Sequence, residues 1–568
     1  MRSSLRLVFF LLVMMAWSSF TTDRKEYPTD YFIAPVKTTI RLSGTFGELR
    51  SNHFHSGLDI KTQQREGLKV YTAASGYISR IKISHWGYGK ALYISHPNGY
   101  TTVYAHLQKF APKIEAYIKK LQYEKESFEI EVFPKITELL VNTEEVIAYS
   151  GNTGGSGGPH LHFEIRDNKE RPINPMLFGI DVKDSRQPMI IGLFAYPIGL
   201  DSHVNDTNEK TKLRIVPTNN GDYTAEAINA YGKIGFGIVT YDQQDLAANK
   251  NGVSNIQTFY NGNKNFEINF KRFSFSETKH LNRLIDYSHF KEEKSRIQKL
   301  FVEQNNPLSM YNNTIDNGYI IVEDSTASVY KLRVSDFKGN NTWLTIPISG
   351  KKNNDLKSQP RQTTEHFIYA DQSNTLEKDN ISVYFPTNTF YDDFFIDFNV
   401  ENDTLTLHEN TVPAQKYFTI NFDISRYLEQ DKDKLFIARK VGYKDFVTYS
   451  FTKRKGNTLS SSTKTLGTYT LATDLDGPKI TPINFQDGKW LSKYRYLKVK
   501  ITDEISGVKN YRATINGKWI LMEYDAKKNS LVYDFNDNII LETKNNLKII
   551  VTDNVGNSST FEATFFRK

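Results

Sequence analysis

The chain has 568 residues, or about four domains at roughly 150 residues each, and 39% of them are hydrophobic, which excludes a mainly disordered chain. It has no cysteine, which excludes thiolate zinc sites, disulfide scaffolds and cysteine nucleophiles. Its net charge of +8 is spread out without a long basic run, so we expect no nucleic-acid partner.

The N-terminus has the pattern of a secretory signal peptide. Arg2 and Arg6 precede an unbroken apolar run over residues 7–17, and Ala16-Trp17-Ser18 offers a small-x-small cleavage site. The run is too short to span a bilayer as a helix. We therefore predict a signal peptide at residues 1–18 and an exported protein, with an uncleaved N-terminal anchor as the alternative.

Residues 30–180 are predicted to form an antiparallel β-sheet domain that carries the chemistry. Seven of the twelve histidines lie before residue 163. Short runs of β-branched and aromatic residues between turn signals predict strands. These runs are residues 69–71, 76–78, 91–94 and 100–104.

One segment of this domain interrupts the strands. Ile114, Ile118 and Leu121 are spaced by four and three, as on the apolar face of a helix. Residues 128–132 then alternate between apolar and acidic, as on a strand. We interpret residues 111–140 as an inserted helix–strand unit at the rim, which either shapes a substrate cleft or only packs.

The residues after 180 are predicted to be rich in β-structure, and they contain a diverged internal repeat. Residues 184–190 resemble residues 474–480, and residues 334–340 resemble residues 551–557. The first motif of each pair opens a segment and the second nearly closes it, which predicts Ig-like β-sandwich modules at 184–350 and 474–568. We interpret the repeated Asp-x-x-Gly-Asn elements as turns before a last strand, with a calcium site there as the alternative.

A third β-rich module is predicted at residues 366–472, after a polar linker at residues 351–365. Its strand candidates are Ser382–Phe385 and Tyr417–Phe422. Ser460–Ser462 and its neighbours predict a loop.

Three short motifs near the N-terminus point to one chemistry. They are His55-Ser-Gly-Leu-Asp59, Tyr104-Ala-His106-Leu107 and Gly158-Pro-His160-Leu-His162-Phe-Glu164. On a strand, His160 and His162 would place both imidazoles on one face. Two histidines and an aspartate offer the ligands that suit Zn²⁺, and three protein ligands leave the fourth position open for water.

In combination these motifs resemble peptidase family M23, the lysostaphin- and LytM-like zinc endopeptidases of peptidoglycan. The flanking segments resemble the family as well: Phe46–Arg50, Val70–Gly76, His96–Tyr100 and Ile147–Gly154. The resemblance covers about residues 40–175. The departure from it is the 111–140 insertion, where simpler members have a short connection.

The resemblance implies one Zn²⁺ per chain, held by His55, Asp59 and His162. His106 and His160 match the non-ligand catalytic histidines of the family. One would be the base toward a metal-activated water and the other a proton donor, and the sequence leaves open which is which.

Several polar residues near these motifs have either a role in the site or an ordinary structural role. His53 is either a competing ligand or a residue that supports a ligand or lies at the surface, and His85 and His96 are interpreted as loop or strand-end residues. Glu164 either orients an imidazole through a hydrogen bond or faces solvent. The glycine-rich residues 154–158 are interpreted as a mobile groove wall rather than a phosphate loop, because no lysine follows them.

The resemblance thus implies an exported endopeptidase that hydrolyses peptide bonds in bacterial peptidoglycan and binds its stem or cross-link peptides. We expect it in the periplasm or cell envelope rather than released. The alternative is a non-catalytic peptidoglycan-binding scaffold or an activator of cell-wall hydrolases. The C-terminal β modules could also bind a cell-envelope protein partner.

Overall fold

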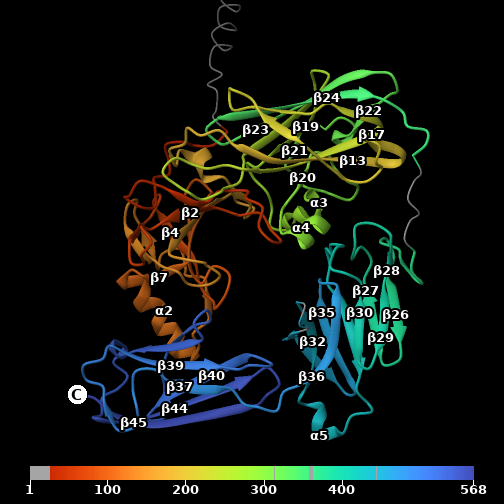
Figure 1. The fold of residues 1–568 in the computed structure, drawn as a ribbon. Coiled ribbons are helices and arrows are strands. Elements are labelled where there is room, and N and C mark those ends of the chain that lie inside the picture. Colours follow the sequence, from red (N-terminus) through yellow and green to blue (C-terminus); the bar gives the residue numbers. More distant parts are fainter. Residues whose placement is uncertain (1–25, 313, 357–362, 443, 445) are drawn as a thin grey trace, which may run out of the picture.

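The computed structural model describes residues 26–312, 314–356, 363–442, 444 and 446–568. The predicted signal peptide, residues 1–18, lies outside the described residues. Strands far outnumber helices, which confirms the mainly β class. Figure 1 shows four parts that follow one another around the molecule, so that the last part returns to the first. Within the described part of the chain, no helix has the length and apolar content needed to cross a membrane.

The N-terminal domain, residues 30–180, is built on a nine-stranded sheet. Its main strands, in spatial order, are β1 (Leu42–Gly44), β2 (Leu58–Lys61), β11 (His160–Arg166), β6 (Thr101–Ala105), β5 (Lys90–Ser95), β4 (Gly76–Ile83) and β8 (Ile130–Val132). A second sheet joins β3 (Lys69–Tyr71), β10 (Val146–Ser150) and β7 (Leu107–Phe110). All four predicted strands are present. Because β11 lies between β2 and β6 at the centre of the larger sheet, nearly all of its residues are buried.

The predicted helical insertion is confirmed. Helix α2 (Pro112–Lys125) begins with a proline, which suits the first turn because its missing N–H has no partner there, and it buries Ile114 and Ile118 against the domain. The following β8 pairs antiparallel with β4 and extends the large sheet. The insertion therefore belongs to the fold of the N-terminal domain.

The next module, residues 184–350, has no separate core. Its twelve-stranded sheet is organised by four long strands: β13 (Met189–Val204), β17 (Ile228–Tyr241), β23 (Ala327–Ser335) and β24 (Asn341–Gly350). One continuous cluster of buried apolar residues runs from the N-terminal domain into this module. The rings of Phe46 and Phe54 lie 5.2 Å and 5.5 Å from the ring of Phe273.

The region at 366–472 has a core of its own between two five-stranded sheets. One contains β26 (Asn374–Lys378), β27 (Ile381–Phe385), β31 (Phe418–Asp423), β35 (Thr458–Thr463) and β34 (Thr452–Lys455). The other contains β29 (Phe398–Glu401), β30 (Thr404–Leu407), β36 (Gly467–Thr473), β32 (Leu435–Val441) and β33 (Phe446–Tyr449).

The predicted loop at Ser460–Ser462 is wrong, because these serines lie in β35. That strand pairs with β31 on one side and β34 on the other, which satisfies its backbone groups. Leu459 and Ser461 face inward and are buried. The run of serines hides this alternation, which only the two flanking strands establish.

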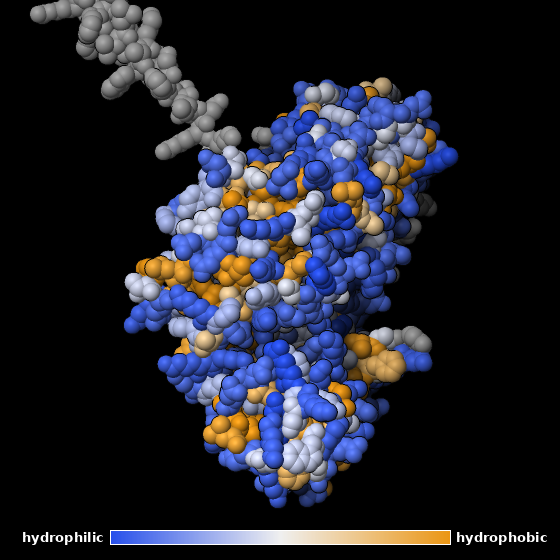
Figure 2. Space-filling view, turned by 90° about the vertical axis from the view of Figure 1, so that its left-hand side faces the viewer, coloured by the Kyte–Doolittle hydropathy of each residue, from blue (hydrophilic) through white to orange (hydrophobic). Residues whose placement is uncertain are grey.

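The C-terminal module, residues 474–568, also has its own core. Its sheets are formed by β37 (Lys479–Pro482), β39 (Tyr496–Thr502), β43 (Ser530–Asp534) and β42 (Met522–Asp525), and by β38 (Lys489–Trp490), β45 (Ser558–Phe566), β44 (Lys544–Asp553), β40 (Val508–Ile515) and β41 (Lys518–Trp519). In Figure 1 this module lies directly below α2. Hydrophilic side chains predominate around it on the face seen in Figure 2.

Candidate active site

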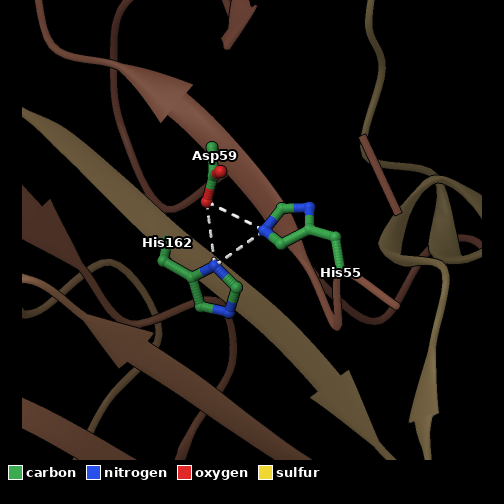
Figure 3. Close-up of side chains that lie close together, drawn as sticks. All are labelled: His55, Asp59 and His162. Carbon is green, nitrogen blue, oxygen red and sulfur yellow. Dashed lines mark hydrogen bonds and ion pairs between the residues drawn. The ribbon is translucent and has the colours of Figure 1, made fainter. Parts of the chain in front are cut away.

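Three side chains, from the neighbouring strands β2 and β11 and from the segment just before β2, converge in the N-terminal domain (Figure 3). His55 Nε2 lies 3.0 Å from Asp59 Oδ1 and 3.1 Å from His162 Nδ1, and His162 Nδ1 lies 2.9 Å from the same Asp59 oxygen. The strand register brings two of them together, since Asp59 on β2 is directly opposite His162 on β11. All three side chains are buried.

The outer ring nitrogens of His55 and His162 each form a hydrogen bond with the protein. His55 Nδ1 lies 2.7 Å from the carbonyl oxygen of Thr45, and His162 Nε2 lies 2.7 Å from Glu164 Oε1. Because a carbonyl and a carboxylate can only accept, these nitrogens carry the hydrogens and donate. His55 Nε2 and His162 Nδ1 therefore face one another and Asp59 as the free ligand atoms.

The donor set fits a zinc ion. A tetrahedral ion with bonds of about 2.0–2.2 Å places neighbouring ligand atoms roughly 3.3 Å apart, close to the separations of 2.9 to 3.1 Å found here. Asp59 Oδ2, which points away from the cluster, accepts a hydrogen bond of 3.1 Å from Arg50. An outer partner thus orients each of the three groups, as in protein metal sites.

His106 and His160 lie beside this cluster and do not belong to it. Their ring centroids are 4.7 Å apart, and His160 Nε2 is 3.3 Å from Asp59 Oδ1. The Nδ1–H of His106 donates to the carbonyl of Thr153 at 2.8 Å, and that of His160 donates to the carbonyl of Gly158 at 2.8 Å. In both rings Nε2 is left as the nitrogen that can exchange a proton.

His106 occupies its position at a backbone cost. It follows β6 with a φ of 58°, a left-handed conformation that is unfavourable for residues with a side chain. Its backbone N–H donates to the carbonyl of Tyr88 at 3.0 Å. The turn directs the imidazole toward His160, which a regular continuation of the strand would not do.

The electrostatics divide the histidines into two groups. Burial, reinforced by the neighbouring His162 and His160, lowers the pKa of His106 to about 3, so its imidazole is neutral near pH 7. Burial opposes protonation of His162 as well, but its hydrogen bonds to Asp59 and Glu164 prevail and raise its pKa to about 9. The second proton of His162 is the one that a metal ion would replace.

Glu164 orients His162 and does not face solvent. Its side chain is fully buried, and it accepts hydrogen bonds from Ser56 Oγ at 2.7 Å and Arg166 Nε at 2.6 Å. Although burial would raise it, the Arg166 guanidinium holds the pKa of Glu164 well below its usual range. Glu164 is thus the carboxylate that fixes the tautomer of His162.

Tyr88 and Arg166, which the sequence motifs did not single out, both contact Glu164. The Tyr88 hydroxyl contacts Glu164 and its ring stacks on His162, with centroids 5.2 Å apart. The only available signals were the Trp86-Gly87-Tyr88-Gly89 turn and the alternation that places Arg166 on the same face as Glu164. Neither identifies a residue that orients a metal ligand.

The remaining predicted residues lie outside the cluster. His53 is exposed and bonds to the neighbouring Asn52. His85 contacts Glu129 of the insertion, with the two side-chain atoms 3.3 Å apart. His96 is buried as a structural residue, with ring nitrogens 2.9 Å from the carbonyl of Ser75 and 2.8 Å from Thr102 Oγ1.

A groove of about 830 Å³ leads to His160 and Asp59. Gly157 and Gly158 form one wall, as expected of the glycine-rich segment, and Arg41 and Lys61 add positive charge. Leu246 of the next module also lines the groove. Among the described residues that line it, none comes from the 111–140 insertion, so the insertion does not shape this cleft.

Comparisons with known proteins agree with this geometry. Residues 53–123 and 137–175 match the model of peptidase family M23, and the unmatched stretch between them lies in the insertion. Residues 365–474 match a Zu5-like domain, which covers the third β module.

Curated relatives match the same part of the chain. DD-carboxypeptidase/endopeptidase Mpg of Neisseria meningitidis serogroup B is 33% identical over 160 residues, which are 27% of this chain and 30% of the relative. Peptidoglycan DD-endopeptidase ShyA of Vibrio cholerae serotype O1 is 30% identical over 157 residues, again 27% of this chain and 30% of the relative. The match thus spans less than a third of the length of each relative.

A solved structure described as a zinc-containing peptidase from Vibrio cholerae is 25% identical, covering 28% of this chain and 41% of that chain with a TM-score of 0.20. The family model and the curated relatives agree on the part of the chain that holds His55, Asp59 and His162. The chain therefore carries a metallopeptidase domain of peptidase family M23.

Proposed function

We propose that this protein is an exported zinc-dependent endopeptidase that hydrolyses peptide bonds in bacterial peptidoglycan. The observation that carries the proposal is the convergence of His55 Nε2, Asp59 Oδ1 and His162 Nδ1, with every outer atom held by a protein partner. Curated relatives named as peptidoglycan endopeptidases support the substrate class. The location, periplasm or cell envelope, rests on the predicted signal peptide.

His55, Asp59 and His162 would hold the zinc ion. When bound, zinc acidifies water and polarises a carbonyl group toward attack. The groove cations Arg41 and Lys61 would bind the carboxylates of the stem peptides and bring the scissile bond to the cluster. Tyr88, Glu164 and Arg166 would keep His162 in the ligating tautomer.

His106 and His160 would carry out the proton transfers. The neutral His106 can take up a proton at Nε2, because its Nδ1–H is fixed on Thr153. His160 presents Nε2 closest to the ligand atoms and would act on the reacting groups there. General acid–base groups of this kind contribute about 10²- to 10⁴-fold to rate.

The test is incubation of the mature protein with purified peptidoglycan, with and without a zinc chelator, and identification of the products by mass. New amino and carboxyl ends that disappear with the chelator are the expected result. His160→Ala should lower the rate about 10²- to 10⁴-fold without unfolding the protein, and exposed His53→Ala is the matched control.

The alternative function is a non-catalytic peptidoglycan-binding scaffold or an activator of other hydrolases. Bound zinc without any cleavage would contradict the enzyme. A cellular role that His160→Ala leaves intact would then favour the scaffold.

A further inference from the structure

A second cluster of charged side chains lies at the start of the 184–350 module, away from the histidines. Asp184, Asp242 and Asp336 each place a carboxylate oxygen within 4.8 Å of the other two. Asp184 lies on the segment that leaves the N-terminal domain, Asp242 follows β17, and Asp336 follows β23. Three points of the fold thus meet at one group of oxygens.

Two of the three side chains are buried, and Asp336 accepts hydrogen bonds from the backbone N–H and the side-chain amide of Asn340 at 2.9 and 2.6 Å. Asp242 is 2% exposed and Asp336 is 6% exposed. Within the described ranges, no lysine or arginine forms an ion pair with any of the three aspartates. Burial and mutual repulsion raise the pKa of Asp242 to about 8 and that of Asp184 to about 6.

Unpartnered polar atoms face the same place. Asp242 Oδ1 has no hydrogen-bond partner, and neither polar atom of the Asn251 side chain has one, although Asn251 is 3% exposed. Asn251 and Asp242 exchange both backbone hydrogen bonds, at 2.8 and 2.9 Å, so they are directly opposite and their side chains lie on the same face. Buried polar groups are rarely left without a hydrogen-bond partner, because each unsatisfied group lowers the stability of the fold by about 1–3 kcal/mol.

We propose that Asp184, Asp242 and Asp336, with the amide oxygen of Asn251, bind a calcium ion. The ligands are all oxygens, which suits a hard cation rather than zinc. Calcium takes 6–8 oxygens at about 2.3–2.6 Å, so oxygens on opposite sides of the ion are roughly 4.8 Å apart. Gln244 lies two residues after Asp242, and its Oε1 is also buried without a hydrogen-bond partner. It is a further candidate ligand.

The C-terminal module shows that such a triad can also be satisfied by protein. Asp474, Asp503 and Asp553 lie within the same distance of one another. In both triads an asparagine donates to both oxygens of one aspartate: Asn557 to Asp553 at 2.8 and 2.7 Å, and Asn340 to Asp336 at 2.9 and 2.6 Å. The other two aspartates of the C-terminal triad also accept backbone N–H bonds, from Ser506 at 3.0 Å and Gly507 at 2.6 Å, whereas Asp242 Oδ1 in the first triad has no partner. The proposal is therefore confined to the first triad.

The proposed calcium site would act on the peptidase groove, and this part of the inference rests on the proposed function. Residues 242–251 form a loop closed by the Asp242–Asn251 pair, and Leu246 within it lines the groove. Gly252, the next residue, binds Thr45 Oγ1 through its N–H at 3.0 Å. Thr45 in turn holds His55 through its carbonyl, so calcium would stiffen both the groove wall and the support of a zinc ligand.

For the test, the full mature chain is stripped of divalent ions and resupplied with one equivalent of zinc. Calcium is then titrated in, and binding is measured by calorimetry and stability by thermal unfolding. The wild type should bind calcium with a Kd of about 1 mM or tighter, as extracellular calcium modules do. Asp242→Asn should lose one bound equivalent and the calcium-induced rise in Tm. Asp245→Asn, a charge-matched change in the same loop that bonds to Ser185 instead, should keep both.

Folding of the variant is checked in the same experiment. Without calcium, Asp242→Asn should melt no lower than the wild type, because it removes one of three repelling carboxylates. The proposed site would be overturned if Asp242→Asn and the wild type bound calcium with equal stoichiometry and affinity. It would also be overturned if the wild type bound no calcium up to 10 mM, about ten times the expected Kd. No substrate is present, so the outcome does not depend on whether the protein cleaves peptidoglycan.

Discussion

The two β modules at 184–350 and 474–568 are attached to the peptidase domain in opposite ways. The 184–350 module shares a continuous apolar core with it, in which Phe46 and Phe54 pack on Phe270 and Phe273. The C-terminal module has a core of its own and contacts the peptidase domain through ion pairs, hydrogen bonds and a few ring contacts. The first module is thus a structural part of the catalytic unit, whereas the second is a separate body held against it.

The polar docking surface lies on α2 and the neighbouring strands. Lys90, which is 4% exposed, places its ammonium group 2.9 Å from both carboxylate oxygens of Glu523. Tyr123 of α2 donates to Asp537 at 2.7 Å. Lys527 reaches the carbonyl of Ser156, at 3.0 Å, on the loop that also holds His160. The insertion thus serves as the platform for the last module.

The largest expected difference is between two truncations. A chain that ends at residue 183 exposes the apolar surface around Phe46 and Phe54, so we expect it to lose cooperative folding. A chain that ends at residue 473 keeps that core and should retain the folded peptidase domain. Thermal unfolding followed by near-UV circular dichroism measures both. Cooperative unfolding of the shorter chain would contradict the shared core.

Phe273→Ala should destabilise the protein by about 3–5 kcal/mol, because it opens a cavity between the peptidase domain and the first module. Chemical denaturation measures the change in the free energy of unfolding. Phe451→Ala, in which the ring is 64% exposed, is the matched control and should change it by less than about 0.5 kcal/mol. Similar losses in the two variants would argue against a core that joins the two parts.

Glu523→Gln should weaken docking of the C-terminal module by about 1–3 kcal/mol, since it leaves the Lys90 ammonium group buried without its carboxylate. Hydrogen exchange of α2 should become faster, while exchange in β11 stays unchanged. The double variant Lys90→Met/Glu523→Met removes both partners and should restore slow exchange. An unchanged rate in the single variant would show that this ion pair does not hold the module.

Glu126→Gln should have the smallest effect. Its ion pair with Arg512 has a length of 2.6 Å, but the side chains are 46% and 51% exposed. Exposed pairs contribute about 0–1 kcal/mol and are screened by salt. The exchange rate of α2 should therefore rise slightly at low salt and match the wild type near 1 M salt. A loss as large as that of Glu523→Gln would reverse the order of the two contacts.

The sequence predicted the site through residues that are close together in the chain. Asp59 follows His55 by only four positions, and His162 follows His160 by two, so that alternation on β11 places both imidazoles on one face of the sheet. It did not predict which nitrogen of each histidine is free. For His55 and His106 that choice depends on the carbonyls of Thr45 and Thr153, whose distances in sequence carry no periodic signal. For His162 it depends on Glu164, two residues further along the same strand, where the alternation left an orienting role and a solvent-facing one both open.

By itself the sequence determined the β-rich class, the helical insertion and the histidine and aspartate motifs whose side chains converge, because hydrophobic period and short-range spacing are properties of neighbouring residues. The tertiary structure alone decided that Tyr88 and Arg166 support Glu164, that Ser460–Ser462 form a strand, and that three distant aspartates meet. Those outcomes depend on strand register and on packing between segments that are not neighbours in the chain, and both are fixed only when the whole core closes.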